Sequence, residues 1–412
     1  SINVISIFLI YLDENKRHQL TSSAYQVDLS CTHIFQKTLF NYADFLETYS
    51  SSKIQNVTSL WYQYTQDISK PSLETSTFMA IQSMLFRRCQ RIKKFYISLA
   101  EDSSTFLLIP SSWFYSSELR ECEFKFVVSD SQNMIVYNYI NLISIMNKRI
   151  QIIRIMAYNE DIPPECREPF LNLISAQTEL KELELNYFST SSFTPLLRQE
   201  MLQTKSQSLR KLILQGIKFD KDNLTNIAPN LEILSIKCSF GNPFERELSN
   251  EVKEEFILLL SQNCPNMTTL CYITDNLIFS STLKIFKKLC QLQIGGFAYY
   301  DLPYSNQDYL QALVRYLPSS LKVLNLLNVH DYSHENLDRF LQDFDVERVK
   351  LEVLILPFNI EFDLLPNLRK FVEKAKNLRY IELVRSENCD VEKQKDSEKE
   401  IIDLCHIEFN LM

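Results

Sequence analysis

A short apolar pattern repeats along most of this 412-residue chain and limits its possible folds more than any other feature. The pattern is L-x-x-L-x-L, in which other apolar residues can replace leucine. Its eleven copies begin at Ile92, Leu119, Ile150, Leu180, Leu209, Leu231, Met267, Leu289, Leu321, Leu351 and Leu378. The mean spacing is about 29 residues, which lies at the long end of the range for leucine-rich repeats. One copy would be a weak signal in a chain rich in leucine and isoleucine, but eleven at similar spacing are a strong one.

The segments between the copies resemble amphipathic helices. We expect helices to begin at Ser249 or Asn250, at Ser305 or Asn306, and at Ser333, because these polar residues can cap a helix that carries apolar residues on one face. A unit of one strand, one turn and one helix cannot bury its apolar face alone, so such units stack. The predicted fold is an α/β leucine-rich-repeat solenoid of an irregular, ribonuclease-inhibitor-like type. We expect parallel strands on its concave side and a helical cap at its N-terminus.

Composition excludes two classes of ligand. The chain has only four glycines, Gly216, Gly241, Gly295 and Gly296, and none has the spacing of a phosphate-binding loop. Such loops need glycine because only glycine lets the backbone approach the phosphate closely. The formal net charge is −8, whereas nucleic-acid binding needs clustered positive charge. We therefore expect no nucleotide cofactor and no nucleic-acid partner.

The residues that usually carry metals or catalysis lack the necessary spacing. Ten cysteines are present but no C-x-x-C pair, so a zinc site is not expected. His330 and His334 are four residues apart, but a helix start at Ser333 would leave His330 in the preceding turn. Glu182 and Glu184 fit solvent-facing positions of a strand rather than a buried acid–base pair. We expect no enzymatic activity, no cofactor and no metal.

The N-terminal apolar stretch does not predict a membrane segment. It runs from Ile2 to Leu12, which is 11 residues, whereas a membrane-spanning helix needs about 20. Scattered cysteines in a long chain are typical of a reducing compartment. We therefore expect no membrane partner and a location in the cytoplasm or the nucleus.

One junction carries a family resemblance. The run N-C-P-N-M-T-T-L from Asn263 to Leu270 resembles the helix-to-strand step of F-box/leucine-rich-repeat proteins, where C-P-x-L-x-x-L opens each strand. Weaker copies lie at Pro229 and Pro366. The resemblance covers roughly residues 75–412. This region is most similar to the fungal members of the family, which have irregular repeats.

The N-terminus resembles a truncated or degenerate F-box. Residues 5–13 resemble the first F-box helix, and Val27 and Cys31 resemble its later Val…Cys pair. The usual opening L-P-x-E is not found, as though the chain began a few residues late, and Ser30 replaces an aromatic residue. The resemblance implies docking to the adaptor subunit of a cullin-type ubiquitin ligase. The side chains it assigns to that contact are Ile5, Phe8, Leu9, Leu12, Leu20 and Val27.

These observations predict three regions: F-box-like helices in residues 1–40, a bridging segment in 41–74, and about eleven repeats with a C-terminal cap in 75–412. The resemblance implies a substrate receptor of a cullin-type (SCF-like) ubiquitin ligase, which holds a target protein and leaves the chemistry to other subunits. The alternative is a stand-alone leucine-rich-repeat interaction scaffold, whose N-terminal helices only cap the solenoid. An L-P-x-E directly upstream would favour the receptor.

The target is expected to bind the concave face. Side chains alternate between the two sides of a strand, so the residues between the leucines face the concavity. This face mixes acidic, basic and apolar residues, which suits a protein partner better than a polyanion, and its aliphatic residues are the expected anchors. The predicted contact residues are Arg154, Glu182, Glu184, Lys211, Ile213, Ile233, Thr269, Gln293, Asn325, Ile355 and Tyr380.

Overall fold

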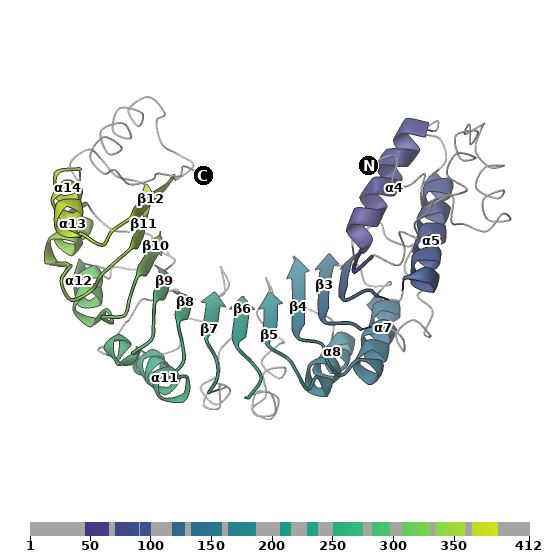
Figure 1. Ribbon diagram of the computed structural model, residues 1–412, viewed down its shortest axis with the longest axis horizontal. Helices are drawn as coiled ribbons and strands as arrows, with labels where there is room; N and C mark the ends of the chain where they lie inside the picture. The colour runs from purple at the N-terminus through teal and green to yellow at the C-terminus, as the bar shows by residue number, and fades with distance from the viewer. Residues whose placement is uncertain are drawn as a thin grey trace. The chain divides into compact units, whose positions relative to one another are not determined.

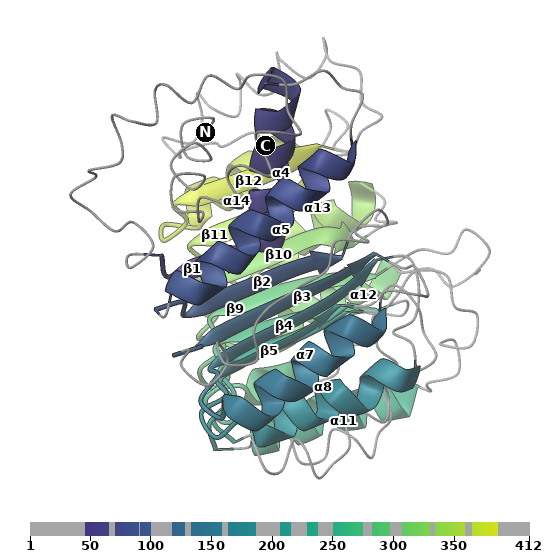
Figure 2. The same ribbon diagram turned by 90° about the vertical axis from the view of Figure 1, so that its right-hand side faces the viewer.

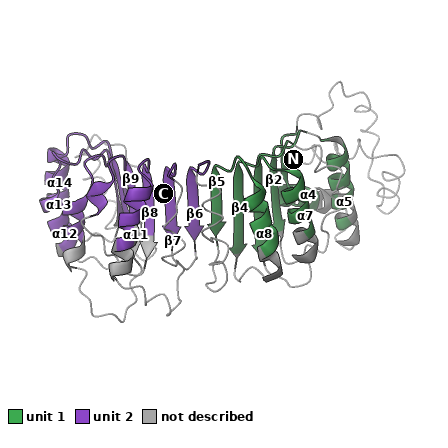
Figure 3. Ribbon diagram, turned by 90° about the horizontal axis from the view of Figure 1, so that it is seen from below, with its two compact units in different colours: residues 1–187 green, residues 188–412 purple. Residues whose placement is uncertain are grey.

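The computed structural model divides the chain into two compact units, residues 1–187 (unit 1) and 188–412 (unit 2), which Figure 3 shows in different colours. Both are α/β repeat structures, and each is described by itself. The structure describes residues 46–65, 71–89, 91–99, 118–127, 133–158, 164–186, 207–215, 229–237, 250–274, 282–296, 307–329, 334–358 and 365–385.

Unit 1 contains five parallel strands that pair in sequence order. Its helices α5, α7 and α8 lie on one side of these strands (Figure 2). The strands are β1 (Thr48–Ser50), β2 (Lys94–Leu99), β3 (Glu121–Val127), β4 (Ile152–Tyr158) and β5 (Glu182–Asn186). The helices are α4 (Ser51–Thr65), α5 (Pro71–Arg88), α7 (Asn133–Met146) and α8 (Pro164–Ala176).

Unit 2 repeats the same plan with seven parallel strands, again paired in sequence order (Figure 1). The strands are β6 (Lys211–Gln215), β7 (Ile233–Lys237), β8 (Thr269–Thr274), β9 (Gln291–Gly296), β10 (Val323–Val329), β11 (Val353–Phe358) and β12 (Tyr380–Arg385). The helices are α11 (Asn250–Asn263), the short 3₁₀ helix η5 (Leu283–Ile285), α12 (Gln307–Tyr316), α13 (His334–Asp343) and α14 (Leu365–Lys374).

The repeat pattern explains the strands. All eleven predicted copies coincide with strands, β2 to β12. In β5, for example, Leu183 and Leu185 are almost fully buried, whereas Glu182 and Glu184 between them are only partly buried. Alternation of this kind turns every leucine toward the helices and every intervening residue to the other face. The predicted α/β leucine-rich-repeat solenoid is confirmed.

A recurring backbone contact fixes the register between repeats. The carbonyl of Lys93, just before β2, accepts hydrogen bonds from the N–H groups of Arg120 (2.7 Å) and Glu121 (3.0 Å). In unit 2 the carbonyl of Thr268 does the same for Cys290 (2.8 Å) and Gln291 (2.9 Å). Because each carbonyl ties two consecutive N–H groups of the next repeat, equivalent side chains line up in rows across the strands.

The first strand, β1, precedes the first copy of the repeat. It lies within residues 41–74, which the sequence suggests as a bridging segment, and pairs in parallel with β2. The place of the last repeat leucine falls on Ser51, which directly follows β1 and is the first residue of α4. Ser51 is 1% exposed, and its hydroxyl accepts a hydrogen bond from the Ser98 N–H at 2.9 Å. Tyr49 fills the core and packs on Phe86 and Phe95 with ring centroids 4.6 and 5.3 Å away. Because the third apolar position of the pattern is polar here, a search for L-x-x-L-x-L does not find this strand.

The helix predictions hold in unit 2. Helix α11 begins at Asn250, α12 at Gln307 after Asn306, and α13 at His334 after Ser333. The next repeat closes the end of α12, because the Arg348 guanidinium donates hydrogen bonds to the carbonyls of Val314 and Leu317. These two carbonyls lie at the helix C-terminus, where no helical N–H is left to satisfy them.

Residues 1–40 and 386–412 lie outside the described residues. The predicted F-box-like helices, the C-terminal cap, and His330 with its suggested turn therefore remain predictions from the sequence.

Candidate target-binding face

Each unit has a sheet face opposite its helices, which we call its open face. It consists of the residues that alternate with the buried leucines, and parallel pairing aligns them into rows. In unit 1 the first row is Lys94, Glu121, Ile152 and Glu182, and the second row is Tyr96, Glu123, Arg154 and Glu184. Six of these eight side chains are charged, so this open face is the main concentration of polar chemistry in unit 1.

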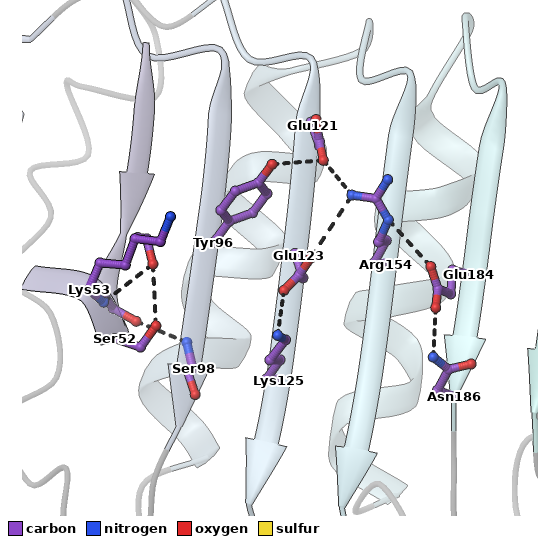
Figure 4. Close-up of polar contacts among 12 residues, drawn as sticks. Ser52, Lys53, Tyr96, Ser98, Glu121, Glu123, Lys125, Arg154, Glu184 and Asn186 are labelled. Carbon is purple, nitrogen blue, oxygen red and sulfur yellow. Dashed lines mark hydrogen bonds and ion pairs between the residues drawn. The ribbon is translucent and has the colours of Figure 1, made fainter. Parts of the chain in front are cut away.

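Arg154 lies among four carboxylates on that face, and Figure 4 shows three of them, those of Glu121, Glu123 and Glu184. Its Nη2 atom is 3.0 Å from Oε1 of Glu182, and its Nε atom is 3.3 Å from Oε2 of Glu184. Its Nη1 atom donates to Oε1 of Glu121 and lies 3.9 Å from Oε2 of Glu123. Three neighbouring strands thus hold one guanidinium and four carboxylates, which we call the Arg154 cluster.

Three of these carboxylates also contact polar side chains other than Arg154. The Tyr96 hydroxyl donates a hydrogen bond of 2.8 Å to Glu121, and the Lys94 ammonium lies 3.4 Å from the same carboxylate. Lys125 pairs with Glu123 at 3.0 Å, and the Asn186 amide donates to Glu184 at 2.7 Å. Among the described residues, the Asn186 side-chain oxygen is buried without a hydrogen-bond partner.

The register explains why this cluster forms. Arg154 is paired with Glu123 on β3 and with Glu184 on β5, so its row neighbours on both sides are glutamates. Cross-strand neighbours are about 5 Å apart at Cβ, which a long arginine side chain can span toward the preceding row as well. There it meets Glu121 and Glu182.

Burial and charge shift the pKa values in this cluster. Burial would raise the pKa of Glu121, but hydrogen bonds from Arg154 and Tyr96 and the charges of Arg154 and Lys94 outweigh it, and the pKa falls below its ordinary value. Burial raises the pKa of Tyr96 to about 12, and its hydrogen bond to Glu121 adds to the shift. Burial would lower the pKa of Arg154, but its hydrogen bonds with Glu121 and Glu182 raise it instead. At neutral pH Glu121 and Arg154 are therefore charged and Tyr96 is neutral.

The open face of unit 2 has a different chemistry. Its two rows, taken over β7 to β11, contain no charged side chain at any of their ten positions, and charges appear only on the strands at either side. The first row is Lys211, Ile233, Thr269, Gln291, Val323, Val353 and Tyr380, and the second is Ile213, Ser235, Cys271, Gln293, Asn325, Ile355 and Glu382. Aliphatic side chains on β6–β7 and on β10–β11 thus flank hydroxyl and amide groups on β7–β10.

This arrangement can bind more readily than it can catalyse. A general acid or base needs a pKa near the working pH, whereas the pKa of Glu121 is lowered and its carboxylate is occupied by Arg154. Among the described residues, no group of three or more His, Cys, Asp or Glu side chains is placed to hold a metal ion. Burial raises the pKa of the Cys122 and Cys264 thiols, which makes them less reactive.

The structure brings together some of the predicted contact residues. Arg154, Glu182 and Glu184 meet in one cluster in unit 1. The other predicted contacts lie on the open face of unit 2, at the row positions given above. Sequence reasoning missed Lys94, Tyr96, Glu121 and Glu123, although the same alternation rule applied to the first two repeats finds them. The predicted adaptor contacts Ile5, Phe8, Leu9, Leu12, Leu20 and Val27 lie outside the described residues.

None of the described helices is long and apolar enough to cross a membrane.

Comparisons with known proteins give structural matches only. The sequence matches no protein-family profile and no curated protein. A crystal structure of an internalin from Listeria monocytogenes matches over 73% of this chain and 75% of its own, with 15% identity and a TM-score of 0.35. A chain of the yeast Rad7 and Elc1 complex matches over 90% of this chain and 99% of its own, with 12% identity and a TM-score of 0.36. Because both TM-scores are low, the fold assignment rests on the repeats and strand pairing described above.

Proposed function

We propose that this chain is a non-enzymatic receptor that binds a target protein on the open faces of its repeats and presents it to a cullin-type ubiquitin ligase. The observation that carries the binding role is the Arg154 cluster. Five charged side chains from three rigid strands are held in one geometry on a sheet face, at side-chain exposures between 9% and 21%. Groups that are already positioned lose little entropy on binding, which favours recognition.

The ligase part of the proposal rests on the family resemblance. In that arrangement residues 1–40 dock on the adaptor, residues 41–74 lead into the repeats, and residues 75–412 hold the target. The chain would then act by proximity, bringing target lysines to a ubiquitin-charged enzyme that belongs to the ligase. Its proposed place of action is the cytoplasm or the nucleus.

A binding assay with the purified adaptor subunit of a cullin ligase tests the docking step. We expect the full chain to bind the adaptor at micromolar concentration and the double variant Phe8→Asp, Leu9→Asp to lose that binding, because a charged pair would disrupt an apolar helical contact. Ile355→Glu is the matched control, since it places a charge on the repeats instead. It should leave adaptor binding unchanged.

The opposite outcome supports the second candidate function. If the full chain does not bind the adaptor, the ligase role is wrong. The open faces would then belong to a stand-alone interaction scaffold. The Arg154 cluster favours that candidate equally, because target binding does not depend on the adaptor. If the chain binds and the double variant binds equally well, the assignment of the contact to Phe8 and Leu9 is wrong.

A further inference from the structure

We propose that the open face of unit 2 binds an extended, mostly uncharged peptide segment of a target protein. The segment would have an acidic residue toward β7, a basic residue toward β12, and aliphatic side chains next to the basic end, over β10 and β11. This inference rests on the target-binding role proposed above and assigns it to one surface. It is independent of docking to a ligase adaptor.

The first argument is the distribution of charge. In the two rows of this face, the ten positions from β7 to β11 are uncharged, although 23% of the whole chain is Asp, Glu, Lys or Arg. Protein interfaces have the same plan, with charged residues depleted in the centre and retained at the rim. At one end of the neutral rows Lys211 on β6 and, in the row beyond them, Lys237 on β7 are positive, and at the other end Glu382 on β12 is negative. A partner with complementary charges at its two ends would therefore bind in one orientation.

The second argument is the aliphatic content of the face. Val323, Val353 and Ile355 occupy adjacent row positions on β10 and β11, and all three are partly exposed. A cluster of exposed aliphatic side chains on a sheet face usually marks a surface that another molecule covers. Aliphatic side chains of a target are the groups that gain most from contact with it.

The third argument is the backbone next to these rows. Gly295 lies two residues after Gln293 on β9, so it occupies the next open-face position of that strand. Because glycine has no side chain, the backbone is uncovered there. Beside it, the pairing of β9 with β10 shifts register between Asn325 and Asn328. A glycine inside a strand often marks a place where another backbone approaches closely. Gln293 and Asn325 lie directly before this point, and a side-chain amide can both donate to and accept from a peptide group.

The spacing sets the length of the segment. Neighbouring strands are about 4.8 Å apart, so the five steps from β7 to β12 span ~24 Å, which an extended chain covers with about seven residues. We therefore expect a linear motif of roughly that length rather than a folded domain.

A phage-displayed library of random linear peptides, selected on the immobilised full chain, tests the inference. We expect enriched peptides to share a basic residue at one end, aliphatic residues next to it, and an acidic residue at the opposite end. Synthetic versions are then titrated by fluorescence anisotropy. Ile355→Glu should weaken their binding about tenfold or more, because it places a charge in the neutral rows. The matched control is Ile145→Glu, which makes the same change at a side chain of α7 that is 61% exposed and lies outside the open faces, and it should have no effect.

A charge swap tests the orientation. Lys237→Glu should weaken binding, and a peptide whose acidic end residue is replaced by lysine should restore it. Thermal unfolding of each variant shows whether it is folded. The inference is overturned if no peptide is enriched, if the enriched peptides are highly charged, or if Ile145→Glu weakens binding as much as Ile355→Glu. None of these results bears on adaptor binding, so the ligase proposal stands or fails separately.

Discussion

The two units bury apolar side chains at equivalent core positions but have different side chains on their open faces. Ile153 in unit 1 and Leu212 in unit 2 occupy equivalent core positions, and both are completely buried. On the open faces the equivalence ends: unit 1 gathers charges around Arg154, whereas the rows of unit 2 are neutral from β7 to β11. In a repeat fold, therefore, the buried side chains of each strand hold the backbone in place, and the side chains on the open face can vary and take part in recognition. In unit 1 the side chains on the open face also contribute to stability, because they form ion pairs and hydrogen bonds with one another.

The largest expected effect concerns what the units share. Ile153→Ala and Leu212→Ala should each lower the free energy of unfolding by about 2–5 kcal/mol, since each leaves a cavity in a packed core. Urea unfolding measures the loss, and hydrogen exchange shows which unit opens. Similar losses in both units would support the equivalence of their cores. A loss below about 1 kcal/mol in one unit alone would show that its core is loosely packed and break the comparison.

The second effect concerns what separates the units. Arg154→Ala should lower the free energy of unfolding by about 1–3 kcal/mol, because it leaves four carboxylates close together without their shared cation. The arginine side chain is 21% exposed, so solvent screens part of this loss. Gln293→Ala, at the same row position in unit 2, is the matched control and should change stability by less than about 0.5 kcal/mol. The same urea titration measures both variants, and equal effects would mean that the Arg154 cluster adds nothing.

The sequence predicts the part of this fold that periodicity controls. The repeat identifies strands β2 to β12 because leucine burial has a fixed spacing, and capping residues identify where helices begin. Strand β1 was missed because Ser51 is buried by a hydrogen bond rather than by apolar contact. Its partner, the Ser98 N–H, is 47 residues away in the chain, and no local pattern indicates such a distant pairing.

The candidate site was predictable in place but not in detail. Alternation puts Arg154, Glu182 and Glu184 on one face, and the structure brings them together. Aligning the repeats at Leu119 and Ile150 also gives the observed register of β3 with β4 and puts Glu121 on this face. The repeat pattern does not show that the Arg154 side chain reaches into the preceding row to contact Glu121. The division into a charged and a neutral open face likewise appears only when the strands are aligned.

Acid should weaken unit 1 through Glu121. Its pKa is lowered in the folded chain from the ordinary value of 4.5, so its contribution is complete above that value and is lost as the pH falls through the lowered pKa. Glu121→Gln should be less stable than the original chain at neutral pH, and the difference should shrink as the pH falls below 4.5. Gln293→Ala in unit 2 removes no titrating group and is the control, so we expect its difference to stay constant. Urea titrations across this range measure both, and a constant difference for Glu121→Gln would contradict the prediction.

Alkali should reveal the smallest effect, through Tyr96. Burial and the hydrogen bond to Glu121 raise the pKa of Tyr96 from 10.0 to about 12, so its neutral form is favoured in the folded chain. The stability that this raised pKa provides is complete below pH 10 and is lost as the pH rises toward 12. Tyr96→Phe should lose about 1 kcal/mol at neutral pH, and the gap should close over that interval. The difference in tyrosinate absorbance between the two chains measures the titration of this one hydroxyl, because the other tyrosines are common to both. Ionisation of Tyr96 near pH 10 in the folded chain would mean that its hydroxyl is not held by Glu121, and that β2 is not linked to the Arg154 cluster through this hydrogen bond.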